Sequence, residues 1–518
     1  MILRQEWERC NGRDGDTSMT QEEMRQILEI GVSLSMEKDF NKLLETILEQ
    51  VMELTRCDAG TLYLLEGEHL KFQFMKNKSM DPGRGADWEE SGLPPVPLTR
   101  RNVCAMALLD KRTILVEDVR NCETYDFSGP ARYDAMTGYH TKSLLVTPLW
   151  NRTGERLGVL QLINAMDETG AVCGFSEEMV LAVESVASQA AITIQNSRYI
   201  SEVKGLIQSF VRMTSSAIDA RTPYNASHTR NMAVYGERFL TYMNRVARRS
   251  GKGVPFSKAH REELLMSIWL HDIGKIVTPL EIMNKNARLS PVQYAEVKGR
   301  LKEVRLLARL AYLEGRSDQE TWRQIQTETA QAQKLVDTVN RIGFLPDDLS
   351  GQIRELGEKR FTDEAGRELP WLTQEECGAL QTRKGTISAE ERRIMQDHVV
   401  LTDRFLAEVE FPKEYSHVRE WAAGHHEMLD GSGYPKGLRG DQIPMEVRII
   451  TLLDVFEALI AKDRPYKKGI PVEQALEVLM EMAEKERKLD IGLVRMFAAS
   501  RCWEEPKQER SLEEGQEV

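Results

Sequence analysis

Five of the nine histidines in this chain of 518 residues fall into short motifs of its second half. They are His228 in NASHTR, His271 in HDIGK, His398 in MQDHVV, and His425 with His426 in GHHEMLDGSGYP. Imidazole and carboxylate ligands together suit iron, manganese or zinc, whereas magnesium and calcium prefer shells made of oxygen alone. The clustering therefore predicts a transition-metal site in the second half of the chain.

One of these histidines, His271, is followed directly by an aspartate, Asp272. Adjacent residues on a helix point about 100° apart, so both side chains reach a metal only if it lies beside the helix, where a carboxylate can bridge two ions. A His-Asp pair often occurs by chance, and a lone buried histidine is usually a hydrogen-bonded core residue. The remaining histidine motifs favour a centre of two metals.

The elements that must position these residues differ between the two halves. In the first half, apolar residues recur at helical spacing from about residue 22 to 54, and AGTLYLL, LKFQF, SLLVTPLW and LGVLQLIN predict strands. Ser176 is predicted to cap one long helix from 177 to about 220. In the mostly helical second half, the segment from about 302 to 384 separates the metal-binding motifs. It therefore behaves as an insertion, with one hairpin around RFTDEAGRELPWL.

Composition limits the partners and the compartment. With 69 Lys and Arg against 81 Asp and Glu, the net charge of −12 disfavours a nucleic-acid partner, although a local metal cluster can still hold a small anion. The seven cysteines are scattered and form no CxxC pair, which argues against a disulfide framework and a zinc finger. No stretch has the apolar length of a membrane span or the apolar core of a signal peptide. These features predict a soluble, cytoplasmic protein that contacts no membrane.

The histidine motifs follow patterns of a known family. HDIGK and HHEMLDGSGYP match the HDxGK and HHExxDGxGYP patterns of the HD-GYP family, and LLDVFEALIAKDRPYKK matches its closing helix. The chain resembles this variant of the all-helical HD phosphohydrolase fold from about 206 to 499. The resemblance implies a metal-dependent phosphodiesterase that hydrolyses cyclic di-GMP to linear pGpG and/or GMP. Two alternatives stay open: a phosphohydrolase of another nucleotide, and a non-catalytic sensor of cyclic dinucleotides.

Residue by residue, the resemblance implies a set of metal ligands with Asp272 as the bridge. The set comprises His228, His271, Asp272, His398, His425, His426 and Asp454. The implied nucleophile is a hydroxide that bridges two ions. Lys275 would lie over a phosphate oxygen, and Arg464 and Lys467 would bind substrate phosphate.

Three further positions near the motifs have two interpretations each. Lys468 could take the place of Lys467, because the chain is one residue longer after Asp454 than the commonest family pattern. Tyr434, in the loop DGSGYP, either contacts substrate or gives the loop its shape. Glu427 either orients a ligand histidine or is solvated.

The expected number of ions follows from a departure from part of the family. Members that hold three metals carry Glu four residues before the first ligand histidine, where this chain has Tyr224. A phenol with a pKa near 10 stays protonated at neutral pH and is a poor ligand. We therefore expect two divalent ions per chain, with iron or manganese as the metal.

The first half resembles a GAF domain, a sensor fold of sheet and helices. The resemblance rests on RCDAGTLYLL, LGVLQLINA, GFSEE and ASQAAITIQNSRY, and it implies an unidentified small-molecule ligand that regulates the enzyme. Of the signature of its cyclic-nucleotide-binding members, Asn164, Phe175 and Glu178 are present, whereas Ala165 and Glu177 replace Lys and Asp. The residues that match therefore favour a role in fold stability over nucleotide binding.

The long helix carries an apolar seam. Ile200, Val203, Ile207, Phe210 and Ala217 follow alternating spacings of three and four residues, interrupted at position 214. This pattern fits either a stripe buried on its own domain or the seam of a homodimer.

The predicted plan is an α+β GAF sensor domain followed by an all-α HD-type helical bundle, joined by a long helix. The expected segments are an N-terminal extension at 1–21, the GAF domain at 22–198, the connecting helix at 177–220, the catalytic domain at 206–499 with its insertion at about 302–384, and an acidic, disordered tail at 503–518.

Overall fold

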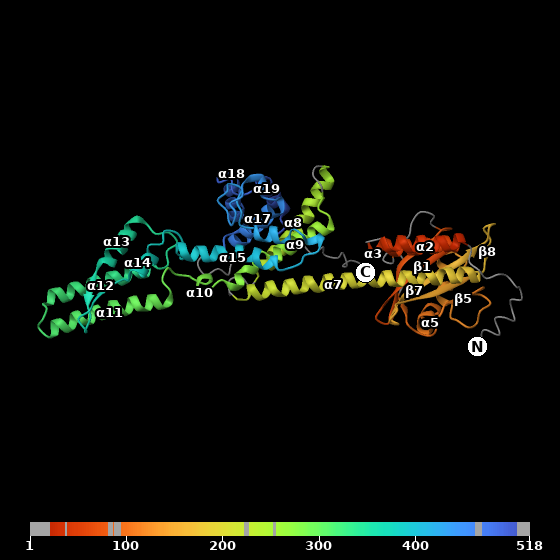
Figure 1. The fold of residues 1–518 in the computed structure, drawn as a ribbon, viewed down its shortest axis with the longest axis horizontal. Coiled ribbons are helices and arrows are strands. Elements are labelled where there is room, and N and C mark those ends of the chain that lie inside the picture. Colours follow the sequence, from red (N-terminus) through yellow and green to blue (C-terminus); the bar gives the residue numbers. More distant parts are fainter. Residues whose placement is uncertain are drawn as a thin grey trace, which may run out of the picture. The chain divides into compact units, whose positions relative to one another are not determined.

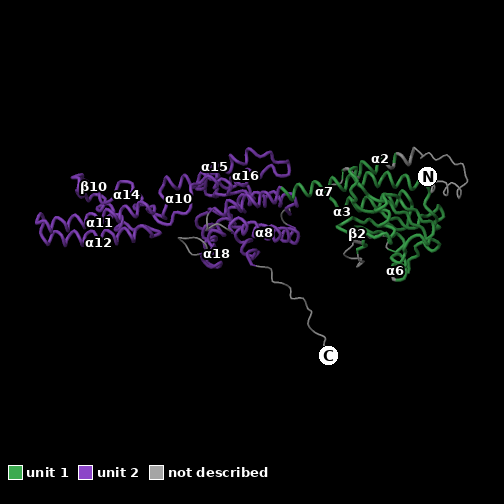
Figure 2. The backbone as a smooth tube through the Cα atoms, turned by 90° about the horizontal axis from the view of Figure 1, so that it is seen from below, with its two compact units in different colours: residues 1–206 green, residues 207–518 purple. Residues whose placement is uncertain are grey.

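The computed structural model describes residues 21–36, 39–80, 86–87, 95–221, 227–251, 255–461 and 469–504. They divide into two compact units, residues 1–206 and 207–518 (Figure 2). Several expectations fall outside the described residues: nearly all of the N-terminal extension and the acidic tail, and the side chains of Tyr224, Arg464, Lys467 and Lys468.

The first unit is built on one antiparallel sheet in the order β3-β2-β1-β7-β6-β5, with β4 paired to β2 and β8 to β7. The strands are β1 Cys57–Glu66, β2 His69–Asn77, β3 Ala86–Asp87, β4 Val96–Pro97, β5 Ile114–Val116, β6 Leu144–Trp150, β7 Arg156–Met166 and β8 Val172–Cys173. The helices are α2 Gln21–Met36, α3 Phe40–Leu54, α5 Val103–Asp110, α6 Ser128–Thr137 and α7 Glu177–Asp219. The α+β class expected of this half is confirmed.

Alternation along the strands explains why helices cover both faces of the sheet. Side chains of β1 point alternately to opposite faces, so Leu62 and Leu64 join the core with α3 and α7, whereas Tyr63 joins a second core with α5. In Figure 1, α2 and α3 lie on the opposite side of this sheet from α5. Ser176 caps α7 as predicted, because its hydroxyl accepts from the Met179 amide at 3.2 Å.

The second unit is helical around the predicted motifs, which confirms the expected class. Its helices outside the insertion are α8 His228–Ser250, α9 Lys258–Leu270, η1 Ile273–Val277, α10 Leu280–Met283, α15 Ala389–Ala407, η2 Lys413–Tyr415, α16 Val418–Ala423, η3 Gly440–Gln442, α17 Met445–Ile460, α18 Val472–Glu484 and α19 Ile491–Ser500. Phe239 of α8, Leu264 of α9, Phe456 of α17 and Phe497 of α19 share one buried core. The core holds in place the helices from which the histidines project.

The insertion has a core of its own. It comprises α11 Pro291–Leu313, α12 Gln319–Val339, α13 Asp347–Glu358, β9 Arg360–Thr362, β10 Glu368–Pro370 and α14 Gln374–Leu380. The predicted hairpin is present as β9 and β10. The first helix begins at Pro291, before the expected start near residue 302, because Ser290 and Gln293 form a capping box. Arg288 is fully buried and donates to the carbonyls of Ile342 and Thr382. The bond to Thr382 joins the start of the insertion to a residue near its end.

Among the described residues, no helix is both long enough and apolar enough to cross a bilayer.

Candidate metal centre

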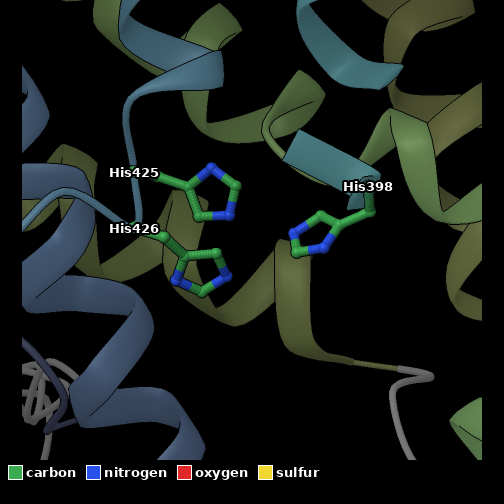
Figure 3. A group of neighbouring side chains, drawn as sticks. All are labelled: His398, His425 and His426. Carbon is green, nitrogen blue, oxygen red and sulfur yellow. The ribbon is translucent and has the colours of Figure 1, made fainter. Parts of the chain in front are cut away.

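The predicted ligands come from five separate places in the helical unit and lie close together. His228 is the first residue of α8, His271 and Asp272 lie between α9 and η1, and His398 lies within α15. His425 and His426 follow α16, and Asp454 lies within α17. Two groups of potential ligand atoms result, each within 4.8 Å: one from His228, His271 and Asp272, the other from His398, His425 and His426 (Figure 3).

Three of the histidines are held in the tautomer that a metal requires. Nδ1 of His271 lies 2.7 Å from the Ile268 carbonyl, and Nδ1 of His425 lies 2.7 Å from the Ala422 carbonyl. His398 makes the same contact with a carbonyl three residues earlier. Each Nδ1 therefore carries its proton, and each Nε2 presents a lone pair.

These lone pairs have no partner. Among the described residues, Nε2 of His271, His398 and His425 and Oδ1 of Asp272 are buried without a hydrogen bond. A buried polar atom left unpaired costs roughly 1–3 kcal/mol, so four in one place call for an occupant that accepts their electron pairs. Neutral imidazole and carboxylate suit a divalent transition metal, so the residues fit such ions.

Two carboxylates lie between the groups of histidines. Oδ2 of Asp272 is 3.2 Å from His271 Nε2, and its Oδ1 is 3.4 Å from His398 Nε2. Asp454 likewise has Oδ1 at 3.3 Å from His228 Nε2 and Oδ2 at 3.6 Å from His426 Nδ1. Each carboxylate thus offers one oxygen to each group, the arrangement that bridging two ions needs.

Charge favours the ionised form of Asp272. Burial alone would raise the pKa of the Asp272 carboxyl, but neighbouring positive charge, including that of Lys275, holds that pKa well below its usual range. Lys275 Nζ lies 2.5 Å from Asp272 Oδ2, with 18% of its side chain exposed. The lysine therefore contacts the carboxylate while part of its side chain stays accessible to solvent.

One carboxylate of the site, Glu457, is not among the residues predicted from the motifs. Its Oε2 binds Nδ1 of His228, its Oε1 accepts from the Asn231 amide at 3.2 Å, and only 3% of it is exposed. Burial lowers the pKa of His228, but hydrogen bonds to Asp454 and Glu457 outweigh burial and raise it to about 10. A carboxylate on the second nitrogen orients a ligand histidine and increases its basicity. The signal was present, since Glu457 follows Asp454 by three residues and so shares its helix face.

The glycine of HDIGK lets two backbones touch. A Cβ on Gly274 would lie 1.9 Å from the His398 carbonyl oxygen and 2.7 Å from the Thr402 amide. Instead, the Gly274 amide donates to Thr402 Oγ1 at 3.0 Å, and that hydroxyl donates to the His271 carbonyl at 3.0 Å. The close approach brings His398 of α15 to His271 and Asp272.

Comparison with known families agrees with both halves. The GAF domain family matches residues 39–194, and the HD domain family matches residues 374–491. The chain carries a GAF domain and an HD domain. Both resemblances inferred from the motifs are thereby confirmed. The HD match includes His398, His425, His426 and Asp454, and the structure joins to them the ligand candidates that precede the insertion.

Curated relatives of the HD domain are phosphodiesterases by name. The 3′3′-cGAMP-specific phosphodiesterases 3 and 2 of Vibrio cholerae are 37% identical over 103 residues and 42% identical over 115 residues. A cyclic di-GMP phosphodiesterase of Thermotoga maritima is 35% identical over 103 residues. These matches cover 20%, 22% and 20% of this chain, and only 22%, 21% and 27% of the relatives' own lengths.

A solved GAF domain from an Acinetobacter phosphoenolpyruvate-protein phosphotransferase aligns with 36% of this chain and 99% of its own, at 16% identity and a TM-score of 0.28.

The GAF domain contains a cavity of about 400 Å³ between strands β1, β2 and β7 and the segment of α5 and α6. Among the residues that the structure describes, the lining of this cavity does not include Asn164, Phe175 or Glu178, which match the signature of the cyclic-nucleotide-binding members. Asn164 donates to the Tyr139 hydroxyl at 3.0 Å and the His140 carbonyl at 2.8 Å, and Phe175 lies in the core. These contacts agree with the role in fold stability that the sequence favoured for Asn164 and Phe175.

In the glycine-rich loop of the HD domain, the structure corrects the role expected of Glu427. Glu427 is only 2% exposed, and its oxygens accept from the amides of Lys436 at 2.7 Å and Leu438 at 2.8 Å. It therefore holds the loop, whereas the sequence suggested solvation or a contact with a histidine. The Tyr434 ring lies 4.8 Å from the ring of His426, and burial raises the pKa of its phenol.

Proposed function

We propose that the protein is a metal-dependent phosphodiesterase that hydrolyses a cyclic dinucleotide. The observation that carries this proposal is the set of buried, unpaired donor atoms on His271, His398, His425 and Asp272. The names of the HD-domain relatives support the reaction class. They include phosphodiesterases of cyclic di-GMP and of 3′3′-cGAMP, so cyclic di-GMP is the first candidate substrate and 3′3′-cGAMP the second.

Two ions would be held by the two groups of histidines together with the carboxylates of Asp272 and Asp454. When bound, divalent ions stabilise charge on a phosphodiester oxygen and lower the pKa of the attacking water. The protein's own part is to keep Nδ1 of the ligand histidines protonated on backbone carbonyls. Lys275 would hold a phosphate oxygen, and Tyr434 would lie beside the substrate at His426. Arg464 and Lys467 remain proposed phosphate contacts.

The direct test is turnover. Protein purified anaerobically and loaded with iron or manganese is incubated with cyclic di-GMP and, in parallel, with 3′3′-cGAMP, and the products are separated by chromatography. We expect linear dinucleotide, mononucleotide or both from at least one substrate. His398→Ala should abolish the products, whereas His140→Ala, an exposed histidine of the GAF domain, should not. Tight binding without any product in metal-loaded protein would replace the proposal with a non-catalytic sensor.

We also propose that the protein is a homodimer joined along α7. The seam predicted from the sequence is exposed: 59% of Ile200, 54% of Val203, 43% of Ile207 and 64% of Phe210 are accessible. An exposed apolar stripe at this spacing is typical of a coiled-coil seam. The interpretation as a stripe buried on its own domain does not hold for these residues.

Sedimentation analysis tests the dimer. Val203→Glu with Phe210→Glu should convert a dimer into a monomer, because paired carboxylates cannot be buried at a seam. Val234→Glu, at an exposed valine of α8, is the matched control and should leave the mass unchanged. A wild-type monomer at micromolar concentration would contradict the proposal.

We further propose that a small molecule in the GAF cavity regulates hydrolysis. A ligand acts on the second unit only through different affinity for two states of the protein. Removal of residues 1–176 should then change the rate while the metal content, which reports an intact site, stays the same. Identical rates under all conditions would argue against regulation.

A further inference from the structure

The C-terminal end of α7 lies against the elements that carry the metal centre. Its last residue, Asp219, is only 6% exposed and accepts from the amide of Thr229 at 3.3 Å and from its hydroxyl at 3.2 Å. Thr229 directly follows His228. One face of the helix is also anchored, because Val211 packs against a cluster that includes Leu270 and Ile273, on either side of the HD pair.

Two residues beyond the helix, Arg221 binds the loop that carries Lys275. Its Nη1 donates to the carbonyls of Lys275 and Ile276, and its Nη2 donates to that of Thr278 at 3.3 Å. A planar guanidinium can hold several acceptors at once, which a lysine ammonium on a flexible stem does less well. Arg221 therefore acts on the backbone of this loop at three points.

The inner side of this loop is held on α15 by the bond from the Gly274 amide to Thr402, whereas its outer side packs loosely. The segment is a short 3-10 helix, which ends with the Thr278 amide bonded to the Lys275 carbonyl. The side chains of Ile276 and Val277 are 47% and 53% exposed, so their packing contributes little. Arg221 therefore acts as a clamp: it adds to the bond from the Thr278 amide to the Lys275 carbonyl at 3.1 Å a second restraint on the carbonyl side of Lys275, opposite the bond from the Lys275 amide to the Asp272 carbonyl at 2.9 Å.

We propose that Arg221 is a positioning residue for the hydrolysis: it fixes the backbone of Lys275 so that Nζ stays between Asp272 and the substrate phosphate. This inference rests on the proposed function. It also makes the end of α7 the point at which a movement of that helix reaches the site, because Arg221 and Asp219 both extend from it.

A double-mutant cycle tests whether Arg221 acts through Lys275. Misplacement of a catalytic group by about 1 Å can cost about 100-fold, so we expect Arg221→Ala to lower kcat about 10- to 100-fold with metal content unchanged. In a Lys275→Ala background the same change should cost less than about twofold, because the group that Arg221 positions is gone. Equal losses in both backgrounds would overturn the inference.

The matched control is Arg238→Ala. Arg238 is also partly buried, and its Nη1 donates to the carbonyls of Cys502 at 3.2 Å and Glu504 at 2.8 Å, away from the site. It repeats the chemistry of the clamp without touching Lys275. We expect its kcat to match the wild type.

Amide hydrogen exchange gives a readout that does not need activity. Arg221→Ala should speed exchange at least about 10-fold in a peptide covering 273–278 and leave the first turns of α8 unchanged. Unchanged exchange at 273–278 overturns the positioning role. A wild type that hydrolyses neither dinucleotide overturns the proposed function and the catalytic part of this inference, even where the exchange result supports the clamp.

Discussion

The metal centre of the HD domain and the cavity of the GAF domain show two ways in which one chain builds a site. At the metal centre, buried ionisable side chains face one another with unpaired donor atoms. The GAF cavity is lined mostly by uncharged side chains. Among them, the Tyr63 hydroxyl donates to Gln161 at 2.9 Å, and burial raises the pKa of the Cys104 thiol. Metal binding restricts residue type at each position, so it leaves motifs, whereas a cavity of this kind depends on the fold.

The largest expected difference between the two regions comes from two buried aspartates. Asp272→Asn should lower hydrolysis by at least about 1000-fold and remove bound metal, because an amide cannot bridge two cations. In the GAF domain, the Ser79 and Tyr139 hydroxyls both donate to Asp58 Oδ2 at 2.7 Å. Asp58→Asn puts an amide NH2 in place of one carboxylate oxygen and should cost about 1–3 kcal/mol of stability without loss of metal. Rates, metal content and urea unfolding are measured for both variants. If Asp272→Asn kept its full metal content, the expected difference between the two domains would be wrong.

The second effect concerns the carboxylate behind a ligand. Glu457→Gln should weaken Mn²⁺ binding about 10- to 100-fold, because His228 loses the charged partner of its Nδ1. Glu446→Gln is the matched control, since Glu446 makes a similar contact with His260 Nε2 at 2.8 Å outside the metal centre. Titration calorimetry measures both affinities, and equal affinities would show that Glu457 does not tune the site.

One glycine in each domain lies too close to a neighbouring backbone for a side chain to fit. A Cβ at Gly274 meets the His398 carbonyl at 1.9 Å, and one at Gly158 meets the Tyr63 carbonyl at 2.0 Å. Either change to Ala should destabilise its own domain by about 1–3 kcal/mol. Only Gly274→Ala should also weaken Mn²⁺ binding, as followed by calorimetry beside urea unfolding. Weakened metal binding in Gly158→Ala would show that the two regions are not independent in this respect.

The smallest predicted effect is that of a single hydroxyl. Tyr434→Phe keeps the ring beside His426 and removes one potential hydrogen bond to substrate, worth about 1 kcal/mol or about fivefold in kcat/KM. Tyr63→Phe, which removes the bond to Gln161 in the GAF cavity, should leave kcat/KM unchanged. An unchanged value for Tyr434→Phe would assign its ring a purely structural role.

The sequence predicted the parts of the molecule that local pattern specifies. The long helix from 177 is present as α7, the strands of the first half form one sheet, and the histidine motifs converge. These features depend on periodicity, on Ser176 as a cap, and on residue types that only metal chemistry groups together.

The missed features depend on contacts between distant segments. Glu457 meets His228 across 229 positions, and Arg221 meets Lys275 across 54. The same holds for Gly274, whose need for a missing Cβ comes from the backbone of α15. The start of the insertion could have been predicted from the sequence, because the capping pair Ser290 and Gln293 is local.

The histidines and carboxylates are proposed to form a centre for two metal ions. Elemental analysis of protein purified without chelator, beside Asp272→Asn, tests it most directly. We predict two transition-metal ions per chain in the wild type and a loss of both in the variant, because Tyr224 stands where three-metal proteins carry Glu. A wild type with no tightly held ion, a wild type with three, or a variant that keeps two would contradict the account.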